Sequence, residues 1–162
     1  MNLWRLDCGA QTVLVGGNEN LAEVFYWGKL LPEAENLKAI WDITRLDYSG
    51  GVLDGVPALS ICPEVSKTFN GHPGMRIRGA SGKRLYPNFR LTNAKLSKTS
   101  LLLEYEDPKI GLTYKANFRA HKETSVFELS ASLTANTDIL VDWFAAPVLP
   151  ATQAAQKMID FS

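Results

Sequence analysis

The chain has 162 residues, the size of one domain, and it is 46% hydrophobic and 21% charged, a composition typical of a globular protein. Its 17 Lys and Arg residues balance 17 Asp and Glu residues, so no positive surplus exists to attract nucleic acid or an anionic membrane. A (β/α)₈ barrel, which needs about 250 residues, is excluded by length.

The first third of the chain predicts two short strands, residues 11–15 and 24–27, followed by one helix between Pro32 and Arg45. Apolar residues recur there at helical spacing: Ala34, Leu37, Ile40 and Trp41. Pro32 is followed closely by two glutamates, and proline and acidic residues favour the first turn of a helix. The pattern places Trp41 on the buried face of this amphipathic helix.

The rest of the chain alternates apolar and polar residues with period 2, which indicates strands with one buried face. In Leu112–His121, Tyr114 and Phe118 lie on one face, and Lys115 and Arg119 lie on the other. The other predicted strands are residues 58–61, 75–78, 89–94, 100–106, 126–134 and 139–144. The turn at residues 122–124 predicts a hairpin between two of these strands.

Many short strands separated by turns predict an all-β fold, an antiparallel β-sandwich with one short helix, as a single domain over residues 1–162. In the last predicted strand, Trp143 alternates with Val141, which places Trp143 in the core. The chain ends on Met158, Ile159 and Phe161, which is more apolar than a usual terminus. We therefore expect a truncated part of a longer protein.

Residue types that bind metals or cofactors lack the required spacing. The candidate ligands, Cys8, Cys62, His72 and His121, include no pair at ligand spacing, so we interpret them as structural thiols and surface histidines. Ser81 is not in a G-x-S-x-G elbow and is better explained as part of a turn. No phosphate loop or dinucleotide fingerprint is present. We expect neither a metal nor a cofactor.

Carboxylates are the remaining catalytic candidates. Glu104 and Glu106 share one face of a predicted strand, where two solvated, ionised groups are expected rather than an acid/base pair. Asp54 is flanked by glycines in the stretch 48–55, and such a loop can present a carboxylate to a ligand. An Asp-Gly turn between strands explains the same residues without any ligand. The sequence leaves both explanations of Asp54 open.

Aromatic residues near turns and strand ends offer an alternative function. Tyr26, Trp27, Tyr48 and Tyr86 could form flat surfaces for sugar rings, which would make the chain an independent, lectin-like carbohydrate-binding module. Most aromatic residues of a small sandwich belong to its core, however, because each buries a large area. Exposure of two or more of these side chains in one patch would favour binding.

Five short strings, in this order and spacing, resemble one known domain. They are Arg5-Leu6-Asp7, Tyr26-Trp27-Gly28 followed by Leu30, Gly50-Gly51-Val52-Leu53-Asp54-Gly55, Gly71-His72-Pro73-Gly74 and Asp142-Trp143-Phe144-Ala145-Ala146-Pro147. Together they resemble the amino-terminal β-sandwich (supersandwich) domain of bacterial α-galactosidases of glycoside hydrolase family 36. The resemblance runs through essentially the whole chain.

The resemblance implies a division of labour. In that family, a retaining enzyme hydrolyses terminal α-galactosides with two aspartates on a (β/α)₈ barrel that follows the sandwich. It implies that this chain has no catalytic residue, supports a homo-oligomer and meets α-galactoside oligosaccharides only through the complete enzyme. It also implies that Asp54 contacts substrate in a neighbouring subunit, although Gly55 and Val56 stand where a basic residue is commoner.

The amino terminus, MNLWRLDCGA, has no apolar run of signal-peptide length, and no stretch reaches the roughly 18 apolar residues of a membrane helix. Two widely separated cysteines in a chain of this size are more often free thiols of a reducing compartment. We therefore expect a cytoplasmic protein without a membrane partner.

Overall fold

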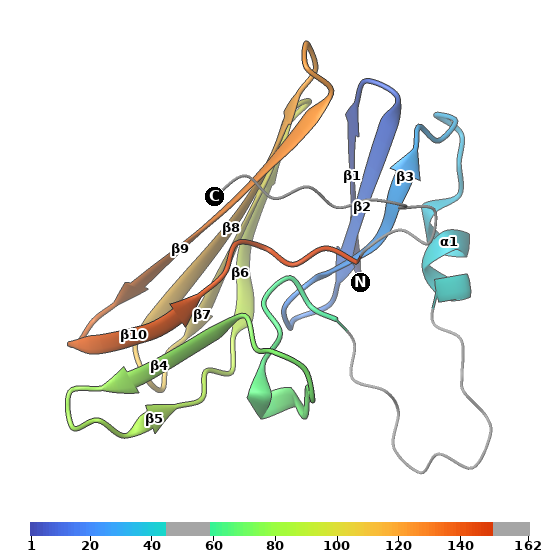
Figure 1. Ribbon diagram of the computed structural model, residues 1–162. Coiled ribbons are helices and arrows are strands. Elements are labelled where there is room, and N and C mark those ends of the chain that lie inside the picture. The colour runs from blue at the N-terminus through green and yellow to red at the C-terminus, as the bar shows by residue number, and fades with distance from the viewer. Residues whose placement is uncertain (45–58, 151–162) are drawn as a thin grey trace, which may run out of the picture.

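The computed structural model describes residues 1–44 and 59–150, which form three antiparallel sheets, one α-helix and one short 3-10 helix (Figure 1). The predicted all-β class with a single short α-helix is confirmed. Within the described ranges, no helix has the length and hydropathy needed to cross a bilayer.

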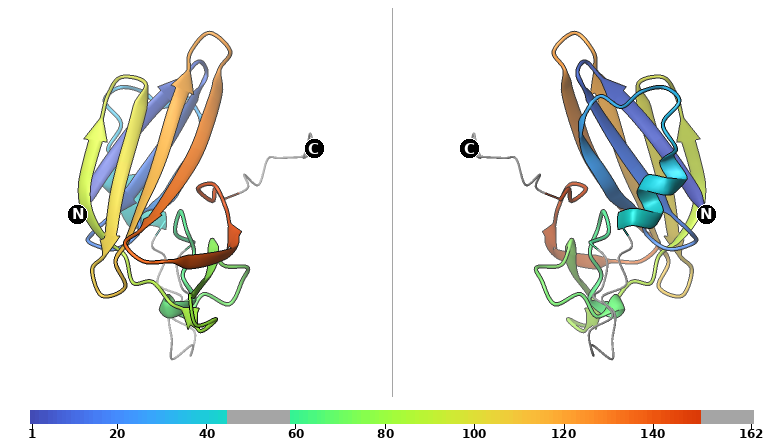
Figure 2. Two further views of the ribbon diagram at one scale, coloured as in Figure 1. Left: turned by 90° about the vertical axis from the view of Figure 1, so that its left-hand side faces the viewer. Right: turned by 90° about the vertical axis from the view of Figure 1, so that its right-hand side faces the viewer.

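Two of the sheets lie face to face as a sandwich (Figures 1 and 2). One contains β1 (Asn2–Cys8), β2 (Gln11–Gly17) and β3 (Glu23–Lys29), in that order. The other contains β6 (Arg90–Leu96), β7 (Ser100–Asp107), β8 (Leu112–His121) and β9 (Val126–Ala135). Their alternating apolar residues meet in one core, where Leu6 and Val13 of the first sheet join Tyr105, Tyr114 and Phe118 of the second.

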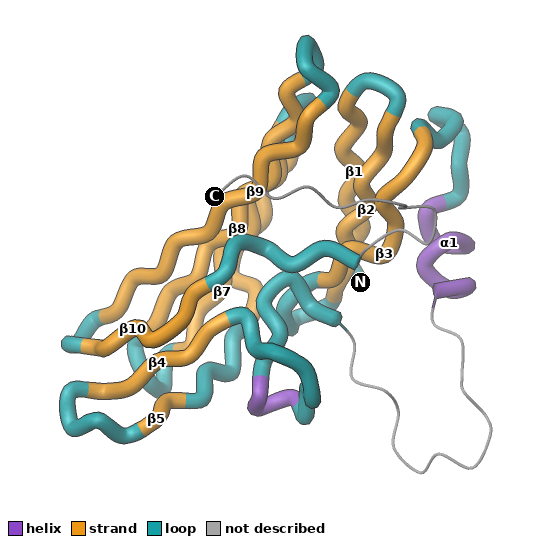
Figure 3. Tube along the Cα trace, in the orientation of Figure 1, coloured by secondary structure: helices purple, strands orange, loops and turns teal. Residues whose placement is uncertain are grey.

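The third sheet lies beside one end of this sandwich and orders its strands as β10 (Ile139–Phe144), β4 (Met75–Gly79) and β5 (Arg84–Leu85). Met75 and Ile77 of β4 are buried in the common core. Apart from the 3-10 helix η1 (Val65–Lys67), the described stretch before β4 is mostly loop (Figure 3). This loop and the third sheet together position the candidate site.

Most predicted strands are found within two residues of their predicted ends. β8 has the predicted bounds, and it pairs with β9 in the predicted hairpin, with His121 opposite Val126. The strand predicted at 58–61 is wrong in its described part, where Ser60 makes only an isolated bridge to Glu23. β1 and β5 were not predicted, although the buried alternation Trp4, Leu6, Cys8 was a usable signal for β1.

The helix, α1 (Leu37–Thr44), begins later than predicted. Asn36 accepts a hydrogen bond at its Oδ1 from the Ala39 backbone N–H at 3.1 Å, as an N-cap residue does. This cap, rather than Pro32, sets the start of the helix. Trp41 is buried as predicted, and its ring meets Phe25 edge-on with centroids 5.1 Å apart.

The core position predicted for Trp143 is wrong. Trp143 is 46% exposed, and its ring packs edge-on against His72, with centroids 4.9 Å apart. The register of β10 against β4 shifts between Val141 and Trp143, so simple alternation fails across Asp142. Only Ile139 and Phe144 of this strand pack against the core.

Candidate binding pocket

A cavity of about 520 Å³ lies between the loop that precedes β4 and the sheet β10–β4–β5. Its volume falls in the range of small-molecule pockets, about 300–1,000 Å³. The polar and aromatic residues that line it include, from the loop, Glu64, Ser66 and Phe69, and from the sheet and the chain beside it, Arg76, Arg84, Tyr86 and Asp142. Buried apolar residues such as Phe89 also line it.

The glycine at the end of Gly71-His72-Pro73-Gly74 holds the loop against the sheet. Its N–H donates to the Pro63 carbonyl at 3.0 Å, and a Cβ added to Gly74 would lie 2.6 Å from the Cys62 Sγ atom. Only a residue without a side chain fits this approach. The Gly74 carbonyl then accepts from the Ala145 N–H at 2.9 Å, which ties the end of β10 to the same wall of the pocket.

Glu64 is the buried polar group of the pocket, with only 9% of its surface exposed. Its Oε1 accepts a hydrogen bond from the Phe89 N–H at 3.2 Å, whereas Oε2 has no partner among the described residues. Burial, the largest cause, raises the pKa of this carboxyl to about 7, because the charged form loses hydration. The buried Asp107 accepts a hydrogen bond from the backbone N–H of Asn88 at 2.8 Å. Its negative charge raises the pKa of Glu64 further.

Arginine side chains stand at the exposed side of the pocket. Arg76 and Arg84 line it, and neither forms an ion pair with any residue in 1–44 or 59–150. Arg78, on the same strand as Arg76, donates to both oxygens of Asp142, at 2.8 and 2.6 Å. This contact holds the pKa of Asp142 below its usual range, and the charges of Arg84 and Arg76 lower it further.

Cys62 also lines the pocket but is buried, and burial raises the pKa of its thiol to about 12. A thiol with that pKa stays protonated at neutral pH, which makes it a poor nucleophile.

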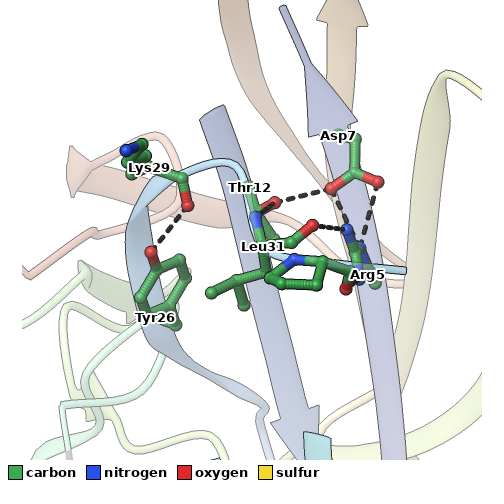
Figure 4. Close-up of polar contacts among 7 residues, drawn as sticks. Arg5, Asp7, Thr12, Tyr26, Lys29 and Leu31 are labelled. Carbon is green, nitrogen blue, oxygen red and sulfur yellow. Dashed lines mark hydrogen bonds and ion pairs between the residues drawn. The ribbon is translucent and has the colours of Figure 1, made fainter. Parts of the chain in front are cut away.

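A second polar cluster ties the chain that leaves β3 to strands β1 and β2 (Figure 4). Arg5 donates to the carbonyls of Leu31 and Pro32, at 2.5 and 2.7 Å. Asp7 accepts from the Arg5 Nε at 3.0 Å and from the Thr12 hydroxyl at 2.6 Å, and Thr12 accepts from the Leu31 N–H at 3.1 Å. Arg5 and Asp7 of the string Arg5-Leu6-Asp7 thus hold the segment that leads to α1 through hydrogen bonds.

The carboxylates predicted from the sequence do not form a catalytic pair in the part of the chain that the structure describes. Asp54 lies outside the described residues. Glu104 accepts from the Lys115 Nζ at 2.9 Å and from the Asn93 side chain at 3.1 Å, and the Lys115 bond lowers its pKa. Glu106 is exposed. An ionised, ion-paired glutamate beside a solvated one is the surface arrangement that the sequence indicated.

The four candidate aromatic side chains do not form one exposed patch among the described residues. Tyr26 and Trp27 are partly buried on β3, where the Tyr26 hydroxyl donates to the Lys29 carbonyl at 2.7 Å (Figure 4) and the Trp27 Nε1 to Gln11 at 3.1 Å. Tyr86 is 55% exposed at the pocket, and Tyr48 lies outside the described residues.

The residue types considered for metal binding are dispersed. His121 contacts Glu128 at 2.7 Å, His72 packs on Trp143, and Cys8 and Cys62 are buried free thiols. Across residues 1–44 and 59–150, no three His, Cys, Asp or Glu side chains gather as a metal site would require. Ser81 lies in the turn between β4 and β5, as predicted.

Sequence reasoning missed Glu64. It lies in a loop without periodicity, so no local pattern marks it as buried. Its role depends on contact with residues 88 and 89, which are distant in sequence.

Solved structures of α-galactosidases of glycoside hydrolase family 36 have this fold. The enzyme AgaA of Geobacillus stearothermophilus aligns with a TM-score of 0.70 at 16% identity, and a variant in complex with raffinose aligns at 0.71 and 14%; both alignments cover 90% of this chain and 24% of that chain. The α-galactosidase of Lactobacillus brevis aligns at 0.62 and 14% identity, covering 89% and 23%. No family profile and no curated protein matches the chain. The chain therefore has the fold of one part of these enzymes and spans about a quarter of their length.

Proposed function

We propose that the chain is a non-catalytic domain of a larger glycoside hydrolase that acts on terminal α-galactosides. The observation that carries this proposal is the alignment of 90% of the chain, at a TM-score of 0.71, with a family 36 α-galactosidase. The order of the five sequence strings supports it independently. Most described acidic residues are exposed or engaged in structural contacts, and Glu64 is the buried carboxyl with a free oxygen, which supports placing a catalytic pair of carboxylates elsewhere in the complete enzyme.

The test is the hydrolysis of raffinose by the complete protein. We expect free galactose to appear, and we expect no hydrolysis of a matched β-galactoside such as lactose. A complete protein that folds but releases no galactose from raffinose or from an aryl α-galactoside would overturn the proposal.

We propose further that the complete enzyme is a cytoplasmic homo-oligomer in which Asp54 contacts substrate bound to a neighbouring subunit. This rests on the resemblance of residues 48–55 to a family loop. Sedimentation velocity of the complete protein tests the oligomer, and a monomer at assay concentration would contradict it.

Substitution of Asp54 tests its role. A charge-assisted hydrogen bond to a galactose hydroxyl contributes about 1.5–3 kcal/mol, so Asp54→Ala in the complete enzyme should weaken substrate binding about ten- to a hundredfold. Its Tm should hardly change. If the kinetics stay unchanged while the Tm falls, Asp54 only holds an Asp-Gly turn.

A further inference from the structure

The pocket beside β4 and β5 offers both hydrogen-bond acceptors and hydrogen-bond donors. Glu64 and Asp142 are its acidic lining residues, and Arg76 and Arg84 are its basic ones. Hydroxyl groups both donate and accept hydrogen bonds, so a ligand rich in hydroxyl groups can use both kinds of lining residue.

Glu64 supplies an acceptor inside the pocket. Its side chain is fixed because Oε1 is bonded to the Phe89 N–H, and its Oε2 has no partner among the described residues. Unlike the Tyr114 hydroxyl, Oε2 is not one of the fully buried atoms without a partner in the described residues, so a ligand or water can reach it. A ligand hydroxyl can satisfy Oε2, and a carboxylate is among the strongest acceptors for such a bond.

The arginines supply donors on the other side. Arg76 and Arg84 line the pocket, and neither forms an ion pair with another described residue. Each presents several N–H groups in a fixed plane. Asp142, by contrast, is already held by Arg78 through two hydrogen bonds, so it has less capacity for a ligand.

Aromatic and apolar side chains complete the lining. Tyr86 is 55% exposed, and Phe69 and Pro73 line the same cavity. An exposed tyrosine beside unpaired polar groups offers a flat apolar face together with a hydroxyl. A pyranose ring has the matching character, with C–H groups on its faces and hydroxyl groups around its edge.

We propose that this pocket binds a neutral sugar ring, with Glu64 accepting a hydrogen bond from one hydroxyl, Arg84 or Arg76 donating to another, and Tyr86 covering a face of the ring. Sugar binding here needs neither hydrolase activity nor a partner chain, because every residue of the proposed site lies within the described part of this chain. The proposed site is not the lectin-like surface considered from the sequence, because only Tyr86 of those four aromatic residues lines this pocket.

Calorimetric titration of the 162-residue chain tests the site, with D-galactose, D-glucose and raffinose as neutral probes and D-galacturonate and inorganic phosphate as anionic ones. We expect saturable binding of at least one neutral sugar. Arg84→Met and Tyr86→Ala, both at exposed positions, should leave the Tm unchanged and weaken this binding about tenfold or more. Glu64→Gln should weaken it similarly, because Oε2 is replaced by a donor.

The matched control is Arg119→Met, which removes an exposed arginine from β8 in the four-stranded sheet. Arg119 does not line the pocket, so this substitution should leave binding unchanged. Absence of saturable binding by all three neutral sugars would overturn the proposal. So would binding that survives both Arg84→Met and Tyr86→Ala, or binding of the anions that is tighter than that of every neutral sugar. None of these results bears on galactoside hydrolysis by the complete protein, which is measured separately as turnover.

Discussion

Two buried tyrosines show how the same residue type can contribute oppositely to stability. Their rings lie 6.0 Å apart in the core. The Tyr105 hydroxyl accepts a hydrogen bond from the Ala22 N–H at 3.2 Å, whereas the Tyr114 hydroxyl has no partner within the described residues. The Tyr105 hydroxyl satisfies the buried Ala22 amide, whereas burial of the unpaired Tyr114 hydroxyl lowers the stability of the folded chain.

Replacing each tyrosine by phenylalanine separates these effects. Tyr105→Phe leaves the buried Ala22 amide unsatisfied and should lower the free energy of unfolding by about 1–3 kcal/mol. Tyr114→Phe removes an unpaired polar atom and should leave that free energy unchanged or raise it by up to about 1 kcal/mol. Urea unfolding of the two variants checks this, each serving as the control of the other. Equal losses would contradict the assignment.

The buried Glu64 carboxyl makes stability depend on pH. Its pKa is about 7 in the folded chain and 4.5 in its ordinary state, so between these values the folded chain holds the proton more tightly than the unfolded chain does. The free energy of unfolding should therefore fall as pH rises from about 4.5 to 7, by about 3 kcal/mol from this group alone.

Glu64→Gln removes this titration. We expect the free energy of unfolding of the variant, minus that of the wild type, to be larger at about pH 8 than at about pH 4.5. Urea unfolding of both proteins at the two pH values measures this difference. Glu106→Gln, at an exposed position of β7, is the control and should follow the wild type. If the difference in stability between the Glu64→Gln variant and the wild type is the same at both pH values, burial of the ionised Glu64 carboxylate does not destabilise the folded protein.

At the scale of elements, α1 packs on the sandwich through Trp41, whose ring lies against Gly16 of β2 as well as Phe25 of β3. A Cβ added to Gly16 of β2 would lie 2.4 Å from the Trp41 Cζ3 atom. The tryptophan ring therefore rests directly on the backbone of the strand. Glycine is required here by the space available.

Gly16→Ala should lower the free energy of unfolding by about 1–3 kcal/mol, the usual cost of overpacking a rigid core contact. Gly79→Ala on β4 is the matched control, because its added Cβ would meet Leu85 at an ordinary 3.9 Å. Thermal unfolding of both variants measures the difference. A Gly16 variant as stable as the Gly79 variant would mean that α1 does not depend on this contact.

The elements also show what the sequence could and could not predict. The period-2 pattern of β8 determined its bounds, its buried face and its hairpin with β9, because both strands keep regular alternation. The same reasoning failed at Trp143, where an irregular register in β10 breaks the alternation. It also placed the helix start too early, because the Asn36 cap competes with the proline signal.

The pocket could not be predicted from any one segment. Glu64 becomes buried only because the loop packs against residues 88 and 89, and the arginines join it only through the pairing of β4 with β5 and β10. These are long-range contacts, which a local sequence pattern does not contain. The hydrogen bond from Arg5 to the Leu31 carbonyl is long-range for the same reason.

At the scale of the whole molecule, the chain is a two-sheet sandwich with a third sheet at its end, joined through one core. If the chain is a non-catalytic domain of a larger hydrolase, as proposed, the bond-breaking step depends on other parts of that enzyme.

The most direct test is a comparison of two initial rates on p-nitrophenyl α-D-galactopyranoside, measured side by side for the complete protein and for residues 1–162 alone. If the chain is a non-catalytic domain, we expect steady release of p-nitrophenol by the complete protein and none above the buffer rate by residues 1–162, which should still show a cooperative unfolding transition. Turnover by residues 1–162 alone, or a folded complete protein without turnover, would contradict it.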